Sequence, residues 1–117
     1  MTGVIFWIIG ERGRSAPSLS SEALSPIERP KWARMHIPKR ADEWLLGRST
    51  VKKLLTAPGL PWEGQSFASL TIDNAPEGAP FVAGTDAPGC ISLSHRAELA
   101  AAAYFDQAGC AVGIDLE

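Results

Sequence analysis

The final twenty residues constrain the fold most strongly, because they read as two extended segments joined by one turn. Residues 98–105 are alanine-rich, and intrinsic propensity alone would favour a helix there. They lead into residues 106–109, Asp-Gln-Ala-Gly, which are typical of a hairpin turn. Residues 110–117 then read as a strand, in which apolar residues alternate with small or polar ones. Because a hairpin needs a strand on both sides of its turn, the sequence predicts a strand over 98–105.

Further short extended segments are spread along the chain. Residues 4–9 are β-branched and aromatic, which predicts a buried first strand ended by Gly10. Alternation predicts strands at 67–72 and 91–94, and a shorter strand is expected at 81–82. Residues 73–80 are rich in Asn, Pro and Gly and predict a turn region. The pattern is that of a small, mostly antiparallel sheet.

Two helices are expected between the first strand and the others. Ser25 is a good N-cap, and Glu28 three residues later completes a capping box, so a first helix starts near Ser25 and has ended by Pro38. A longer helix is predicted over 41–55, where Trp44, Val51 and Leu55 share one face. Basic residues make its other faces polar: Lys39, Arg40, Arg48, Lys52 and Lys53. The predicted class is α+β, with one long and one shorter helix packed on the sheet as a single domain, residues 1–117.

Charge and cysteine content exclude several classes of protein. The formal net charge of −2 argues against nucleic-acid binding through bulk positive charge. No apolar run is long enough to cross a bilayer, and residues 4–9 lack the flanks of a signal peptide, so no membrane association is expected. Cys90 and Cys110 lack CxxC spacing and read as buried thiols of a reducing compartment. We therefore expect a cytoplasmic protein.

Two carboxylates near the end of the chain are the first candidates for chemistry. Asp115 and Glu117 are two apart on a predicted strand, so both side chains point to the same face. Two adjacent carboxylates repel unless a cation lies between them, and Mg²⁺ commonly takes one or two protein carboxylates together with substrate phosphates. The alternative is an ordinary strand with its polar face in solvent.

Two further groups of residues suit anion binding. Ser94 and His95 end a predicted strand and offer neutral donors and a titratable ring to a phosphate, although a capping histidine would look the same. Lys39 and Arg40, with Arg48 further on, lie at the start of the long helix, where the helix dipole also attracts anions. The alternative for this basic group is a solvated helix face.

The order of these segments resembles the larger, surfactin-synthetase-type class of 4′-phosphopantetheinyl transferases. Four segments carry the resemblance: residues 24–28, residues 39–48 with Leu-Gly-Arg at 46–48, the Ser-x-Ser-His of residues 92–95, and the Gly-Ile-Asp-x-Glu of residues 113–117. They span nearly the whole chain in the family's order. Where the family often has Gly-Lys-Pro, this chain has Ala79 in place of the lysine.

The resemblance implies a reaction and a set of roles. Enzymes of this family transfer the phosphopantetheine arm of coenzyme A to a serine of an apo acyl or peptidyl carrier protein, with Mg²⁺ bound at the pyrophosphate. By position, Asp115 and Glu117 would be metal ligands, and Ser94 and His95 would contact the 3′-phosphate of coenzyme A. The basic residues Lys39, Arg40 and Arg48 would lie near its adenosine end.

The resemblance also implies that the site is incomplete. Family members consist of two similar α+β halves, and the second half carries a third acidic ligand and a lysine in a Trp/Phe-x-x-Lys-Glu motif that this chain lacks. The smaller trimeric synthases carry their Asp motif near the N-terminus, unlike this chain. We expect an N-terminal half without its C-terminal half, inactive alone, that pairs with a second half-domain or self-associates. The alternatives are a non-catalytic module binding coenzyme A or a carrier protein, and a structural domain with coincidental motifs.

Overall fold

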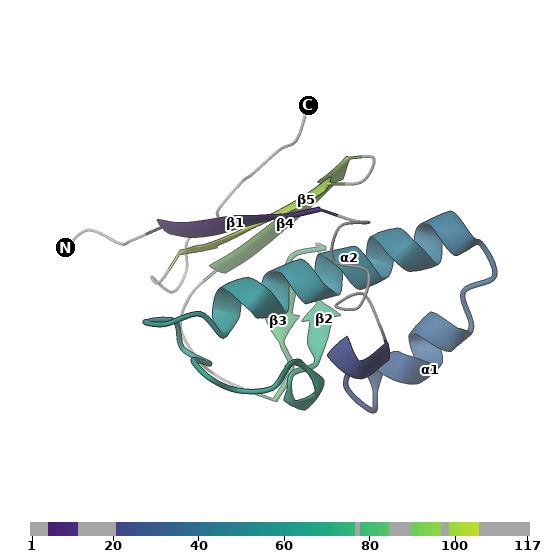
Figure 1. Cartoon of the computed structure of the whole chain (residues 1–117), viewed down its shortest axis with the longest axis horizontal. Helices are drawn as coiled ribbons and strands as arrows, with labels where there is room; N and C mark the ends of the chain where they lie inside the picture. The colour runs from purple at the N-terminus through teal and green to yellow at the C-terminus, as the bar shows by residue number, and fades with distance from the viewer. Residues whose placement is uncertain (1–4, 12–20, 77, 85–89, 97–98, 106–117) are drawn as a thin grey trace.

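The structure is a computed structural model that describes residues 5–11, 21–76, 78–84, 90–96 and 99–105. The secondary structure, in chain order, is β1 (Ile5–Glu11), a 3₁₀ turn (Ser21–Ala23), α1 (Glu28–Ala33), α2 (Pro38–Leu55), a 3₁₀ turn (Phe67–Ser69), β2 (Ile72–Asn74), β3 (Pro80–Val82), β4 (Cys90–Arg96) and β5 (Leu99–Phe105). Figure 1 shows α2 lying along the sheet of β1, β4 and β5, with α1 and the β2–β3 hairpin drawn below α2. The predicted α+β class is confirmed. Among the described residues, no helix is long and apolar enough to cross a membrane.

The larger sheet has the strand order β1-β5-β4, with every pair antiparallel. Ala102 of β5 is level with Ile8 of β1 and with Leu93 of β4. The alanine-rich segment is therefore a strand, as the hairpin argument predicted and against its helix propensity, and it lies in the centre of this sheet. β1 does not end at Gly10 as predicted, since Gly10 pairs with Ala100 and the strand continues to Glu11. The turn predicted at 106–109 and the strand at 110–117 lie outside the described residues.

The core lies between α2 and this sheet. Val51, Leu54 and Leu55 of α2 contribute one side. Opposite them are Ala102 and Tyr104 of β5 and Ile91 of β4, all buried. Leu60, Leu70, Ile72 and Val82 extend the same cluster. The small side chain of Ala102 leaves room for α2 to pack close to the middle of the sheet, and close packing of this kind is sensitive to added volume.

The capping box predicted at the start of the first helical segment is present. The backbone N–H of Ser25 donates to Glu28 Oε1 at 2.9 Å, and the N–H of Glu28 donates to Ser25 Oγ at 3.2 Å. The regular part of α1 begins only at Glu28. α2 begins at Pro38, three residues before the predicted start, because proline suits the first turn of a helix, where its missing N–H has no partner to lose.

The strand predicted over 67–72 was wrong: the chain forms a 3₁₀ turn there, in which Ser69 Oγ donates to the Ser66 carbonyl at 2.7 Å, and only Ile72 begins β2. The alternative of a solvated basic face on the long helix does not hold for Arg48, nor for Lys52 behind it. Arg48 and Lys52 are buried, at 8% and 0% exposed, because acceptors from other elements converge on them. The strands predicted at 81–82 and 91–94 are confirmed as β3 and β4.

Candidate functional site

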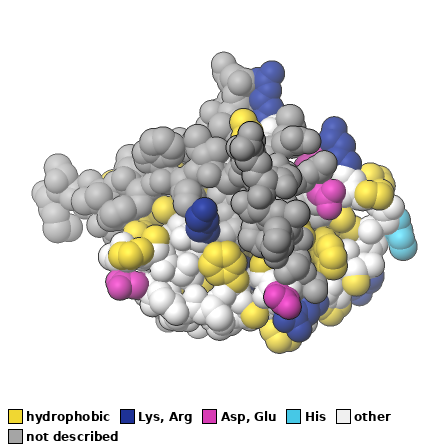
Figure 2. Space-filling view, in the orientation of Figure 1, with side chains coloured by type: hydrophobic (Ala, Val, Ile, Leu, Met, Phe, Trp, Pro, Cys, Tyr) yellow, Lys and Arg dark blue, Asp and Glu magenta, His cyan; other side chains and the backbone are white. Residues whose placement is uncertain are grey.

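A groove of about 510 Å³ lies beside the start of α2. Met35, His36 and Ile37 line it from the α1–α2 connection, and Arg40, Glu43 and Trp44 line it from α2. Basic, histidine and hydrophobic side chains lie together at this end of the molecule in Figure 2. An apolar wall with a few charged groups is the usual composition of a small-molecule site.

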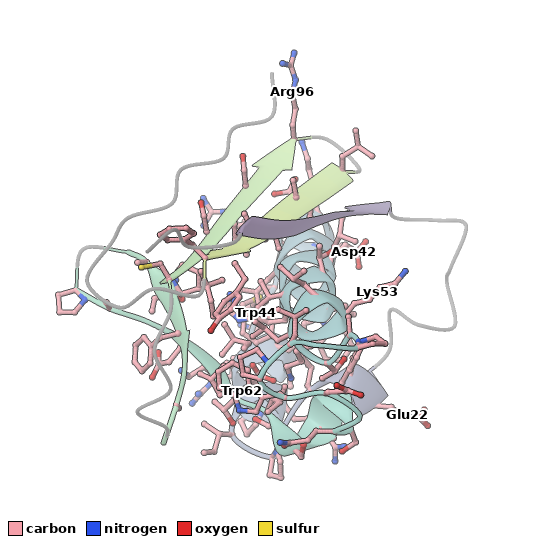
Figure 3. The ribbon with its side chains drawn as sticks, turned by 90° about the vertical axis from the view of Figure 1, so that its left-hand side faces the viewer. Glu22, Asp42, Trp44, Lys53, Trp62 and Arg96 are labelled. Atoms are coloured by element: carbon pink, nitrogen blue, oxygen red, sulfur yellow. The ribbon has the colours of Figure 1, made fainter. Side chains whose placement is uncertain are left out.

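The helix itself brings three of the lining side chains together. Arg40, Glu43 and Trp44 are three and four residues apart, so they share one face of the first two turns of α2. Figure 3 shows Trp44 on the opposite side of α2 from Asp42. Lys39 and Arg40 are both exposed, and the N-cap residue Ile37 makes no side-chain hydrogen bond to the helix start. Two cations and the positive end of the helix dipole therefore stand beside the groove, which suits an anionic group.

Arg48 lies against Trp44 from within the protein. Its Cζ is 4.6 Å from the centroid of the Trp44 ring, a cation–π distance. Its Nη2 donates to Asn74 Oδ1 at 2.9 Å, and its Nε is 4.0 Å from Glu28 Oε2. Burial lowers the pKa of the guanidinium, while the negative charges of Glu28 and Asp73 oppose that change, and an arginine remains charged in any case. The guanidinium of Arg48 therefore already contacts side chains of this chain, namely Trp44, Asn74 and Glu28.

A buried polar network stands behind this pair, centred on the carboxylate of Glu28. Lys52 Nζ donates to Glu28 Oε1 at 2.5 Å and to the Ala23 carbonyl at 2.8 Å. The N–H of Ile72 donates to Glu28 Oε2 at 2.8 Å. Burial lowers the pKa of Lys52, and the hydrogen bond and charge of Glu28 oppose that shift. The network ties α1 and α2 to strand β2.

Sequence reasoning missed both the groove and this network, although one signal was available. Ala41, Leu45, Arg48, Lys52 and Leu55 recur at spacings of three and four, and all five are buried. Arg48 and Lys52 therefore occupy the inward stripe of α2, where a charge requires a partner. Glu28 was assigned only to the capping box, although a buried carboxylate can accept several hydrogen bonds at once.

The other predicted phosphate contacts lie on β4. Ser94 is level with Ala101, and His95, whose side chain is outside the described part, is level with Ala100. Because Leu93 packs against the core below α2, its neighbours Ser92 and Ser94 point to the opposite face of the sheet. Ser94 is partly exposed there and is not among the residues that line the groove.

The predicted metal ligands Asp115 and Glu117 lie outside the described residues. Within the described residues, no three His, Cys, Asp or Glu side chains are grouped so that they could hold a metal ion. Lys39, Arg40 and Arg48, predicted as one basic group, are separated by the fold. The first two are exposed at the start of α2, and the third is buried behind Trp44.

Comparisons with known proteins give a structural match. No family model and no curated protein sequence matches the chain. Among solved structures, the chain is similar to the holo-(acyl-carrier-protein) synthase from Bacillus anthracis str. Ames, determined in complex with CoA (3′,5′-ADP), with a TM-score of 0.71 and 23% sequence identity. The match covers 90% of this chain and 96% of that one. This chain therefore shares the α+β fold of a holo-(acyl-carrier-protein) synthase.

Proposed function

We propose that this chain binds coenzyme A and takes part in the transfer of its phosphopantetheine arm to a carrier protein. The observation that carries the proposal is the groove at the start of α2, which Trp44, Arg40 and His36 line together. One side of the groove is formed by residues 39–48, which resemble the long helix of the phosphopantetheinyl transferases. The similar solved structure, which was determined with CoA (3′,5′-ADP), supports the same activity.

The chemistry of the groove suits the nucleotide end of coenzyme A. Trp44 offers an aromatic surface to a purine ring, and stacking on an aromatic side chain contributes about 1–3 kcal/mol for a nucleobase. Arg40 and Lys39 offer positive charge to a phosphate at the helix start, and His36 offers a ring nitrogen. Met35 and Ile37 supply apolar contact around them. We assign adenosine to the Trp44 wall and the 3′-phosphate to the Arg40 side.

In the transfer that we propose, a carrier-protein serine oxygen attacks the phosphorus that bears the pantetheine arm. A new P–O bond forms, the bond to 3′,5′-ADP breaks, and the serine proton passes to a base. Asp115 and Glu117 supply hard oxygen donors of the kind that hold Mg²⁺, which when bound would neutralise charge on the pyrophosphate. The resemblance gives the 3′-phosphate to Ser94 and His95, but Ser94 points to the sheet face opposite α2. We therefore assign Ser94 and His95 as donors to other phosphate oxygens of coenzyme A, with Arg40 holding the 3′-phosphate.

We propose that a second half-domain or a second copy of this chain completes the site. The resemblance to a two-halved family supports this, because there the remaining acidic ligand and a lysine come from the other half. Light scattering on the isolated chain, followed by a transfer assay on an apo carrier protein, tests it. A monomer that modifies the carrier by itself would overturn this part of the proposal.

Calorimetry with coenzyme A and with 3′,5′-ADP tests the nucleotide site directly. We expect Arg40→Ala and Trp44→Ala each to weaken binding about tenfold, which corresponds to 1.4 kcal/mol. Lys53→Ala is the matched control, since Lys53 is also an exposed cation of α2 but lies about 20 Å further along the helix. Dephospho-coenzyme A should bind less tightly than coenzyme A and should be insensitive to Arg40→Ala.

Three results would count against the proposal in different ways. Absence of binding to either nucleotide by the wild-type chain would refute the nucleotide site. Equal weakening by Lys53→Ala would show that general charge, and not the groove, attracts the ligand. Binding without transfer to any apo carrier protein, even after a partner half is added, would identify a non-catalytic binding module.

A further inference from the structure

The wall of the groove is held by residues that do not line it. Trp44 lines the groove, and Arg48, one turn later on α2, lies against its ring. Arg48 is only 8% exposed and is absent from the groove lining. A long side chain would ordinarily sample many rotamers, and a flexible partner would leave the ring free to move. The position of Trp44 therefore depends on what fixes Arg48.

Asn74 in β2 provides the directional contact to the guanidinium. Its Oδ1 accepts from Arg48 Nη2 at 2.9 Å, over 26 residues of sequence. Glu28 attracts the other edge of the guanidinium from 4.0 Å, but Arg48 Nε makes no hydrogen bond. Because a guanidinium is planar, a bond to one Nη group restricts the plane that faces the aromatic ring.

Asn74 is itself held in place by the β2–β3 hairpin. Its Nδ2 donates to the carbonyl of Gly78 at 2.9 Å, which orients the amide so that Oδ1 is presented to Arg48. Gly78 has φ +101°, a conformation that favours glycine. The two ends of one side-chain amide thus link the hairpin turn to the buried arginine.

We propose that Asn74 and Arg48 are positioning residues for Trp44, and that the β2–β3 hairpin sets the shape of the groove through them. Neither residue need touch the ligand. The proposal rests on the proposed function only for the identity of that ligand, since the position of Trp44 can be measured without one. In this proposal Arg48 positions the Trp44 ring and does not contact coenzyme A itself.

Two variants of Asn74 separate its two hydrogen bonds. Asn74→Ala removes both, whereas Asn74→Asp keeps an oxygen acceptor for Arg48 and loses the donor to Gly78. The measurement is the indole N–H resonance of Trp44, assigned with Trp44→Phe, together with the Kd for 3′,5′-ADP. We expect Asn74→Ala to shift the Trp44 resonance and to weaken 3′,5′-ADP binding about fivefold to tenfold. Asn74→Asp should change both less than Asn74→Ala does, because its oxygen still accepts from Arg48 although the orienting bond to Gly78 is lost.

Trp62 serves as the internal control, because it packs against the core formed by α2 and the sheet, and its backbone N–H donates to the carbonyl of Leu55 at the C-terminal end of α2. Its indole resonance should stay unchanged in both variants. Should Asn74→Ala fail to fold, Arg48→Lys is the second variant. It retains the positive charge beside Glu28 but lacks the planar group, and it should shift the Trp44 resonance in the same way.

The outcomes distinguish this inference from the proposed function. An Asn74→Asp protein that behaves like Asn74→Ala would show that Asn74 serves the hairpin alone, and the inference would fail. An unchanged Trp44 resonance in Asn74→Ala or in Arg48→Lys would also overturn it. If the Trp44 resonance moves as expected but wild-type protein binds no 3′,5′-ADP, the positioning role stands and the proposed function falls.

Discussion

Lys52 Nζ lies 2.5 Å from Glu28 Oε1, and the two residues are 0% and 1% exposed. This ion pair is thus removed from water. Glu28 also accepts the N–H groups of Ser25 and Ile72, and Lys52 also donates to the Ala23 carbonyl. Burying such a pair is offset only when further hydrogen bonds satisfy its charges, and here Glu28 accepts two besides the pair and Lys52 donates one. The pair fixes α1 and β2 to the last turn of α2.

Removing one member of this pair should be strongly destabilising. We expect Lys52→Met to lower the free energy of unfolding by about 3–5 kcal/mol, because it leaves a buried carboxylate without its counter-charge. Urea unfolding followed by circular dichroism measures this, with Lys53→Met at the exposed neighbouring position as the control. The double variant Glu28→Gln/Lys52→Met should lose less than the sum of the single variants. A loss below about 1 kcal/mol in Lys52→Met would contradict the buried ion pair.

The lowered pKa of Lys52 predicts how stability changes with pH. The folded protein holds this proton less tightly than the unfolded chain, whose lysine has its ordinary pKa of 10.5. Between the folded pKa and 10.5 the unfolded state therefore binds more protons, so raising the pH through this window favours the folded state. We expect the free energy of unfolding of wild type minus that of Lys52→Met to rise as the pH approaches 10.5. A difference that falls over this window would mean that the pKa is raised in the folded protein.

The capping box should contribute a measurable part of stability. Ser25 Oγ accepts the N–H of Glu28 and also a hydrogen bond from Thr71 Oγ1 at 2.6 Å. We expect Ser25→Ala to cost about 0.5–2 kcal/mol in thermal or urea unfolding. Ser66 is the control, since it precedes the 3₁₀ turn Phe67–Ser69 without a side-chain cap bond, and Ser66→Ala should change little. Equal effects of the two substitutions would argue against a specific cap.

The central alanine of β5 should not tolerate a larger side chain. Ala102 is fully buried in the cluster that contains Val51 and Leu55 of α2. We expect Ala102→Leu to destabilise the protein by about 1–3 kcal/mol, because α2 would have to move away from the sheet. Ala79→Leu, at an exposed position, should change stability by less than about 0.5 kcal/mol. A stable Ala102→Leu protein would show that the packing between helix and sheet is looser than described.

Sequence patterns alone predicted those structural features that depend on residues close together in the sequence. The capping box follows from a serine and a glutamate three residues apart, and both of its hydrogen bonds are present. The end of α2 at Leu55 follows from the Thr-Ala-Pro-Gly that comes after it. The strand at Leu99–Phe105 was predicted from its place beside a turn, although alanine alone favours a helix. The prediction for 67–72 failed in its first half, because local hydrogen bonds from Ser69 to the Ser66 carbonyl and from the Leu70 N–H to the Phe67 carbonyl form a 3₁₀ turn there.

The amino-acid sequence by itself determined the α+β class, most of the strands, the two helices and the resemblance that suggests coenzyme A. Only the tertiary structure decided which of the charged residues on α2 are exposed. Arg40 faces the groove, whereas Arg48 and Lys52 are buried against partners 24 to 26 residues away in sequence. The physical reason is that a charge can leave water only where an opposite charge or an acceptor meets it. These contacts of α2 with Glu28 and Asn74 form only when segments that are distant in sequence pack together.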